Sequence, residues 1–482
     1  MVLTRFKIAF VMMTAFALTD CARFESYITE RSVVLPDAPK QAAKDTPEQR
    51  EHNRILAAYG GAYDDPKLAA VITDVVDRLV AASERPDLKY KVTILNSPAV
   101  NAFALPTGNL YATRGLLALA NDNSELASVL SHEMAHVIAR HASIREDQVR
   151  QAAIVGRVAT EVLADSQMGA LALAKSKIAL ASFSRAQEFE ADGIGVGISS
   201  RAGFDPYGAT RFLTSMGRNA DFKASLQKID PQSLEFLSSH PATPERVENA
   251  QLNARQFAAP GPGSRERPEY LSAISGMVYG EDPSEGFVRG RRFLHPKLGF
   301  TFMAPGGFAL DNTSQAVFGV RQGGEQALRL DVVRVPAEQS LSEYLVSGWI
   351  ENIDAATVQE VTINGLKAAT ASAKGEPWAF RLYAVRFGSE VYRMIFAAKE
   401  IGPDLDKLFR DTVASFRRMT RAEIRQAKPL RLKIITAGPN DTIASLAERM
   451  PVDRAAERLR VLNGLDPARN ISPGDKVKII IE

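Results

Sequence analysis

The stretch that decides the fold is DNSELASVLSHEMAHVI, residues 122–138. Asp122 and the glutamate three residues later resemble a capping box, which predicts that a helix begins here. The apolar residues that follow recur at helical spacing and form one stripe; they are Leu126, Val129, Leu130, Met134, Val137 and Ile138. At about 100° per residue, Glu133 falls inside this stripe, and His132 and His136 lie on its edge. An isolated buried carboxylate is costly, so the pattern predicts a partner for Glu133.

The motif HEMAH, residues 132–136, supplies that partner as a metal ion. Histidines at i and i+4 lie one above the other on a helix and can hold one zinc ion, while the glutamate between them can act as general base toward a zinc-activated water. The alternative is three polar residues on a solvated helix. With six histidines and 56 acids in 482 residues, about 0.01 chance matches are expected. His141 lies about 140° further round the helix than His136, so we place it outside the site.

A third protein ligand is expected, because a catalytic zinc uses three and keeps one position open. The candidate lies in SRAQEFEADG, residues 184–193, which begins with a second capping-box pattern and should be helical. Glu188 and Asp192 then share one face, and Glu190 points about 200° away from Glu188. This geometry suits Glu188 as ligand and Asp192 as the acceptor that fixes a ligand histidine's tautomer. From these residues alone, Glu188 as ligand and Glu188 as surface acid are equal alternatives.

Three segments together resemble one family of zinc metallopeptidases. They are the HExxH helix, the ExxxD pattern at 188–192 and the segment SSHPATPERV at 238–247. The chain resembles the family of HtpX, the type-I CAAX prenyl protease and BepA over about residues 50–255. The resemblance implies a mainly helical, zincin-type (gluzincin) protease domain with one zinc held by His132, His136 and Glu188. It also implies Glu133 as the base and Asp192 as the hydrogen-bond acceptor of a ligand histidine.

The same resemblance extends to the substrate. It implies a substrate-side edge strand at Asn101, Ala102, Phe103 and Ala104, which would pair with an extended peptide by strand addition. The chain lacks the further membrane spans of HtpX and the prenyl protease, so it is nearest to the exported, BepA-like branch. It also lacks the helical-repeat array of BepA, which leaves partner recruitment open.

His240 and Arg246 allow several interpretations. Arg246 could stabilise the tetrahedral oxyanion or bind the substrate carbonyl. His240 could assist in the same way, or it could occupy the open zinc position and restrain the enzyme. Alternatively, both residues only orient a helix near the cleft. We take the functional interpretation, and the expected site has Glu133, Arg246 and His240 as catalytic residues.

The N-terminus predicts export. Arg5 and Lys7 precede a short apolar run over 8–18, as in a secretory signal peptide. The tetrapeptide before and including Cys21, LTDC, resembles a lipobox, although Asp20 departs from that pattern. Acylation of Cys21 and cleavage near Ala17 are the alternatives. We expect a protein of the periplasm or of the periplasmic face of a bacterial membrane, held there only through an N-terminal lipid anchor if at all.

Composition excludes other classes. Net charge is only +3, from 59 basic and 56 acidic residues, which gives no case for nucleic acid. The single cysteine rules out a disulfide framework. The segment 152–180 is interrupted by charges and reads as amphipathic helices, not as a membrane span.

The expected fold class is α+β and multidomain. Strand-like segments at 300–303, 328–333, 380–385 and 392–396 predict an α+β middle domain. The expected blocks are a signal peptide over 1–21, a zinc metalloprotease domain over 22–258, a linker over 259–284, an α+β domain of unknown role over 285–417, a linker over 418–429 and a LysM-like domain over 430–482.

The final block resembles a LysM module in the segments NDTIASLA (440–447), LNGL (462–465) and ISPGDKVKI (471–479). The resemblance implies a β-α-α-β fold that binds peptidoglycan; a stabilising cap without a ligand is the alternative. Two functions therefore stay open. One is an envelope endopeptidase acting on misfolded or unassembled proteins, and the other is a chaperone-like or peptidoglycan-associated factor with a latent zinc site. An intact Glu133 favours the first.

Overall fold

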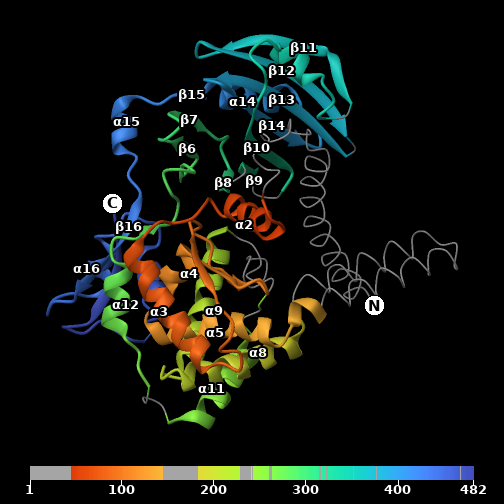
Figure 1. Cartoon of the computed structure of the whole chain (residues 1–482). Helices are drawn as coiled ribbons and strands as arrows, with labels where there is room; N and C mark the ends of the chain where they lie inside the picture. Colours follow the sequence, from red (N-terminus) through yellow and green to blue (C-terminus); the bar gives the residue numbers. More distant parts are fainter. Residues whose placement is uncertain are drawn as a thin grey trace, which may run out of the picture. The chain divides into compact units, whose positions relative to one another are not determined.

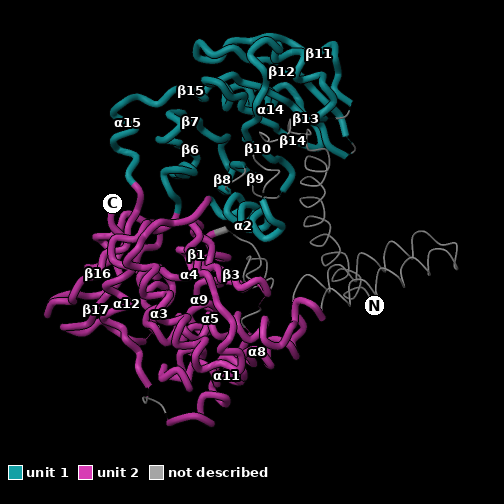
Figure 2. The backbone as a smooth tube through the Cα atoms, in the orientation of Figure 1, with its two compact units in different colours: residues 1–60, 281–428 teal, residues 61–280, 429–482 magenta. Residues whose placement is uncertain are grey.

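The computed structural model describes residues 45–144, 183–227, 240, 243–259, 263–313, 316–321, 324–350, 352–375, 377–466 and 468–482. The expected signal peptide with Cys21 and the segment 152–180 lie outside these residues. No helix within the described part is long and apolar enough to cross a membrane. The chain divides into two compact units, one of residues 1–60 and 281–428 and the other of residues 61–280 and 429–482 (Figure 2).

The first unit is dominated by β-structure. Its helices are α2 (Pro47–Ala58), α13 (Leu341–Leu345), α14 (Pro403–Ala414) and α15 (Arg421–Gln426). Its strands are β5 (Phe287–Arg289), β6 (Arg292–His295), β7 (Phe300–Met303), β8 (Phe308–Asn312), β9 (Val317–Arg321), β10 (Gln326–Val333), β11 (Ile353–Ile363), β12 (Leu366–Gly375), β13 (Trp378–Phe387), β14 (Glu390–Ala398) and β15 (Arg417–Arg418). The four strand-like segments of the sequence fall within β7, β10, β13 and β14, so the prediction of strands there is confirmed.

Both faces of the main sheet of this unit are buried. The sheet is antiparallel with the order β11-β12-β13-β14-β10-β9-β8, and a second sheet has the order β15-β7-β6-β5. On β13, Leu382 packs in one core cluster with Leu345 of α13, whereas Tyr383 packs in another with Phe409 of α14. Alternate side chains of a strand point to opposite faces, so each face is covered by its own helix.

The second unit is mainly helical, with two three-stranded sheets. Its helices are α3 (Pro66–Ala82), α4 (Arg114–Leu119), α5 (Asn123–Ile138), α8 (Arg185–Arg201), α9 (Gly208–Gln227), α11 (Pro244–Phe257), α12 (Arg267–Ile274), α16 (Ile443–Ala447) and α17 (Ala455–Leu462). Its strands are β1 (Lys91–Leu95), β2 (Ala102–Ala104), β3 (Asn109–Thr113), β4 (Val278–Tyr279), β16 (Leu430–Thr436) and β17 (Lys476–Ile481). The sheet orders are β1-β3-β2 and β17-β16-β4. Helix α5 packs against α3, α8 and α9, as Figure 1 shows.

The segment expected to be a linker over 259–284 is structured for much of its length. Helix α12 buries Tyr270, Leu271 and Ile274, and β4 pairs with β16. The linker interpretation is therefore wrong for this part. The breaker cluster AAPGPGS at 258–264 indicated flexible chain, but the apolar residues that follow it have a core to enter.

The final block is not a separate body. Its strands and helices follow the order β16, α16, α17, β17, which is the β-α-α-β order that the LysM resemblance implies. Residues from Leu432 to Ile480 belong to the same hydrophobic cluster as α3, α4 and α5. The segment 429–482 thus completes the core of the helical unit instead of following it as an appended module.

The C-terminal end of α4 is where the final block is held most tightly. Carbonyl oxygens at a helix end have no partner within the helix and need donors from elsewhere. The Lys478 Nζ donates to the carbonyls of Ala118, Leu119 and Ala120 at 2.7, 3.2 and 2.8 Å. The Tyr270 hydroxyl donates to the carbonyl of Leu117 at 2.6 Å. A fully buried amine therefore caps the helix that leads into α5.

We predict that Lys478→Met destabilises the protein. The change keeps the length of the side chain but removes every donor from three buried carbonyls, so the free energy of unfolding should fall by about 3 kcal/mol. Urea unfolding followed by circular dichroism measures this. The control is Lys433→Met at an exposed position of β16, which should change the free energy by less than about 0.5 kcal/mol. Equal stability of both variants would show that the buried amine is not needed.

Candidate metal centre

Helix α5 carries the HExxH motif through the interior of its unit. The Asp122 side chain accepts from the Glu125 backbone N–H at 2.9 Å, and the Glu125 carboxylate accepts from the backbone N–H of Asn121 at 2.9 Å. The predicted N-cap is confirmed, although the Glu125 carboxylate accepts from the residue before the N-cap and not from the N-cap residue itself. Every residue of α5 from Asn123 to His136 is buried. The sequence predicted burial of the Glu133 face only.

Helix α8 places two carboxylates beside this motif. The capping box predicted at its start is present, with Ser184 and Gln187 bonded reciprocally. Glu188 and Asp192 are buried, whereas the side chain of Glu190 is 58% exposed. The close packing depends on Gly195, where an added Cβ would lie 3.0 Å from the backbone N of His132 and 3.1 Å from its Cα. A larger residue would push α8 away from α5.

Four side chains offer donor atoms to one point. They are His132, His136, Glu188 and His240, all buried, with one donor atom each within 4.8 Å of the others. The Nε2 atoms of His132 and His136 lie 3.1 Å apart, and each lies 3.6 Å from an oxygen of Glu188. The structure thus brings together the three residues that the sequence suggested as ligands and His240, which the sequence analysis considered for the open zinc position.

The two ligand histidines turn the same nitrogen toward this point. The Nδ1 of His132 lies 2.9 Å from Asp192, so its N–H donates there and Nε2 is left with a lone pair. The Nδ1 of His136 lies 2.8 Å from the Nδ1 of His141. Burial lowers the pKa of His136 below its ordinary value, and the neighbouring imidazoles add to this. Neutral imidazole is the form that binds metals.

The residues fit a metal ion. Two Nε2 lone pairs facing each other at 3.1 Å repel unless a cation or a proton lies between them. Two nitrogens bound to one tetrahedral zinc lie about 3.3 Å apart. In addition, the buried Oε1 of Glu133 has no hydrogen-bond partner among the described residues. Buried polar atoms normally have a partner, so the centre is incomplete as protein alone.

The electrostatics keep the two carboxylates of α8 ionised. Burial opposes ionisation of Asp192, but hydrogen bonds from Arg246 and His132 outweigh it and lower the pKa to about 2. For Glu188, burial is likewise outweighed by the His240 hydrogen bond and by His132 and Arg246, so its pKa falls below the ordinary value. Glu133 differs: burial raises its pKa to about 8, against the pull of His132. A cation nearby lowers that value, which would make Glu133 a base.

Arg246 lies differently from the sequence expectation. Its NH1 lies 2.6 Å from Glu188, and its Nε and NH2 lie 2.8 and 2.7 Å from the two oxygens of Asp192. The guanidinium therefore binds the two carboxylates of α8, which favours the alternative in which Arg246 orients its surroundings; its contact with a substrate oxyanion stays a prediction. The physical reason is charge, since two buried carboxylates one helical turn apart need a buried cation.

His240 lies inside the cluster. Its Nδ1 is 2.9 Å from Glu188 and 3.4 Å from the Nε2 of His132, while its Nε2 is 3.9 Å from Glu133. The side chain thus lies between ligands and base, where either hypothesis for it, assistance or restraint, can operate.

Helical spacing places His141 outside the site, but in the structure it lies against His136. The helix ends at Ile138, and Arg140 takes a left-handed conformation (φ 56°), which turns His141 back. It is 1% exposed, and its Nε2 lies 3.3 Å from the carboxylate of Glu190. His141 stays outside the four-donor cluster, but the spacing argument misses its contact with His136 because it assumes that the helix continues. The histidine content was the only available signal, since six are present and four gather here.

The strand expected on the substrate side lies at an edge. β2 pairs with β3 as the outer strand of its sheet and packs against α5. Asn101 lies immediately before β2, and its carbonyl accepts from Thr113. Phe103 stacks on Tyr111 with ring centroids 4.9 Å apart. The position of β2 beside the HExxH helix is the one that strand addition of a peptide requires.

We predict that Gly195→Val disrupts the centre. The added side chain must move α8 away from the backbone of α5, so Glu188 and the histidines no longer converge. Zinc content of purified protein should fall well below one per chain. The matched control is Gly217→Val on α9, where an added Cβ meets nothing within 4 Å. Full zinc content in both variants would contradict the role of this close approach.

Comparison with known proteins shows which family these residues resemble. Residues 66–254 match the family model described as Peptidase family M48. The Beta-barrel assembly-enhancing protease of Yersinia pestis is 34% identical over 230 residues, which cover 45% of each chain. The protein of the same name from Escherichia coli (strain K12) is 32% identical over 213 residues, 42% of each chain. Mitochondrial metalloendopeptidase OMA1 of Schizosaccharomyces pombe is 30% identical over 215 residues, 44% of this chain and 59% of the relative.

The match includes every residue of the cluster and Arg246. The chain spans about half the length of the curated relatives it matches, and the match to the family model covers residues 66–254. The sequence resemblance and the geometry of the buried cluster agree with the family match. Over residues 66–254, this chain is similar to peptidase family M48.

Proposed function

We propose that this protein is a zinc metalloendopeptidase of the bacterial cell envelope that cleaves misfolded or unassembled envelope proteins. One observation carries the proposal: the buried carboxylate of Glu133 lies beside three convergent donors, His132, His136 and Glu188. A protein that only binds partners has no need for a buried carboxylate with an oxygen that lacks a hydrogen bond at such a place. The names of the relatives, which include protease and metalloendopeptidase, support the same reaction class.

His132, His136 and Glu188 would hold the zinc ion. When bound, zinc supplies an activated water and polarises the scissile carbonyl. Glu133 removes the proton from the attacking water and then donates it to the leaving amine, which is the general acid–base role of its position. Asp192 and Arg246 keep His132 in the tautomer that presents Nε2 and keep Glu188 ionised.

Extended polypeptide is the substrate form that suits this site. β2 provides an outer strand beside α5, and pairing with the backbone of a substrate is independent of its side chains. Such recognition favours unfolded chains, because a folded protein rarely offers a free extended segment. This is the physical basis for proposing misfolded or unassembled clients.

The proposed location rests on two segments of the chain. We propose export through the signal-like segment before Cys21, with acylation of Cys21 as the anchor. The β-α-α-β order of the final block supports the LysM assignment and, with it, a contact to peptidoglycan. Labelled palmitate should enter the wild type and not Cys21→Ser if the anchor is present.

We predict that Glu133→Gln retains zinc and loses peptidase activity. The amide is nearly isosteric but cannot accept the proton, so β-casein cleavage should fall by about 100-fold to 10,000-fold. Zinc content measured on the same samples should stay near one per chain. The control is Glu269→Gln, an exposed carboxylate on α12, which should cleave like the wild type. Cleavage by Glu133→Gln at the wild-type rate would sink the mechanism.

A second prediction concerns restraint by His240. As a fourth donor it closes the shell that must be open for water, so the resting enzyme would be largely inactive. His240→Ala should then raise cleavage on the order of tenfold without loss of zinc, because the open state becomes the main one. His52→Ala on α2, in the other unit, is the control and should not change the rate.

The opposite result has a clear meaning. If His240→Ala cleaves more slowly than the wild type while zinc content is unchanged, the imidazole assists the transition state. Restraint would then be wrong, and the endopeptidase proposal would stand.

A further inference from the structure

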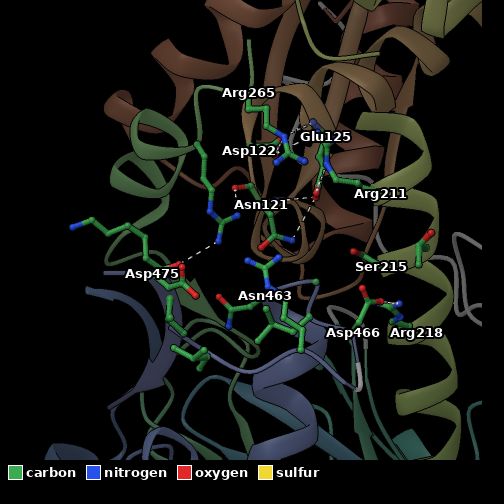
Figure 3. A pocket seen from close by; sticks show the side chains of 18 of the residues that line it. Asn121, Asp122, Glu125, Arg211, Ser215, Arg218, Arg265, Asn463, Asp466 and Asp475 are labelled. Carbon is green, nitrogen blue, oxygen red and sulfur yellow. Dashed lines mark hydrogen bonds and ion pairs between the residues drawn. The ribbon is translucent and has the colours of Figure 1, made fainter. Parts of the chain in front are cut away.

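The helical unit contains a cavity of about 450 Å³ away from the metal centre. It lies where the start of α5, helix α9 and the loops of the final block meet (Figure 3). Asp122, Glu125, Arg211 and Arg265 lie on one side in this view, and Asn463 on the other. All lining residues belong to the same compact unit. The protease chemistry proposed above uses none of them.

The lining is strongly charged and has an excess of positive charge. Five arginines and one lysine line the cavity, against four acids. The acids already have partners: Arg211 lies 3.5 Å from both Asp122 and Glu125, and Arg218 pairs with Asp466. Arg265 also lies 3.6 Å from Asp122, so among the described residues Arg267, Arg469 and Lys476 are the lining cations without an ion pair to an acid of the lining.

Two of these guanidinium groups have no carboxylate partner among the described residues. Arg267 donates only to backbone carbonyls, those of Asn121 at 2.9 Å and Lys476 at 3.2 Å. Arg469 is exposed, and its side chain makes no ion pair within the part of the chain that the structure describes. Burial lowers the pKa of Arg267. The nearby acids Asp122 and Glu125 raise this pKa, and the positive charges of Arg265 and Arg469 lower it. An anion between these groups would relieve that repulsion.

Neutral polar groups complete the lining. The Oδ1 of Asn121 and the Oγ1 of Thr210 are buried without a hydrogen-bond partner among the described residues. Gly464 has a φ of 61°, and a Cβ there would lie 3.2 Å from the amide of Asn121 and 3.3 Å from the hydroxyl of Ser215. The glycine thus leaves space in front of these two side chains. Hydroxyl and amide groups at such a wall suit a ligand that carries hydroxyls.

We propose that this cavity binds a small sugar that carries a carboxylate or a phosphate. Guanidinium groups recognise both oxyanions with paired, charge-assisted hydrogen bonds. Hydroxyl and amide side chains in the same wall recognise the ring substituents. A volume of a few hundred Å³ is typical of sites for small ligands. The proposal does not depend on the metal centre, because no residue of that centre lines the cavity.

The test measures binding by isothermal titration calorimetry to full-length Glu133→Gln protein, which cannot digest itself. Three probes share one ring: N-acetylmuramic acid with a carboxylate, N-acetylglucosamine 6-phosphate with a phosphate, and neutral N-acetylglucosamine. We expect at least one acidic sugar to bind about tenfold or more tightly than the neutral one. Comparing the two acidic probes identifies which oxyanion the cavity prefers.

Two variants locate the site. Arg469→Gln, which removes an exposed cation and no described contact, should weaken binding of the acidic sugar by about tenfold. Arg267→Gln should weaken it further. Arg255→Gln, an exposed arginine of α11 outside the cavity, is the matched control and should bind like the parent protein. No binding of either acidic sugar at millimolar concentration, equal affinity for the neutral sugar, or binding unchanged in Arg469→Gln would each overturn the proposal.

Discussion

The metal centre depends on one guanidinium that is buried between two carboxylates. Arg246 of α11 contacts Glu188 at 2.6 Å and Asp192 at 2.7 and 2.8 Å, and all three side chains are at most 5% exposed. Removing one partner from a buried ionic cluster leaves an uncompensated charge, which typically costs about 3–5 kcal/mol. With Arg246 present, Asp192 stays ionised and can orient His132, and Glu188 stays available as a donor. The packing of α11 on α8, and of α8 on α5, follows from this requirement.

The start of α5 is fixed by a different set of buried polar contacts. Consecutive carbonyls over 117–121 receive hydrogen bonds from Tyr270, Lys478 and Arg267. Two of these donors come from the segment 267–270 and one from the last strand. The carbonyl groups at the end of α4 therefore obtain all of these hydrogen bonds only when the last strand of the chain packs against the protease helices. This explains why the final block shares the hydrophobic core of the helical unit.

Local patterns in the sequence predict local features well. The spacing of His132 and His136, and of Glu188 and Asp192, depends only on helical geometry, so the sequence alone predicts that each pair shares a helix face. Contacts that depend on chain reversal do not follow from such spacing. His141 turns back because the helix ends early. Arg246 lies on α11 but binds two carboxylates of α8, and no local sequence pattern shows that these two negative charges need a cation from another helix. The linker expected over 259–284 fails for the same reason, since its apolar residues enter a core formed with α3 and β16, which lie far away in the sequence.

Helix α5 joins these separate constraints. It has 16 residues, is about 24 Å long, and is buried along nearly its whole length. Its N-cap Asp122 lines the charged cavity beside the final block, and its C-terminal half holds two donors and the base. A buried helix packed on several sides moves as a rigid body, because no solvent-exposed face can absorb a local change. The geometry at the metal donors is therefore set jointly by α8 and α11 at one end and by the final block at the other.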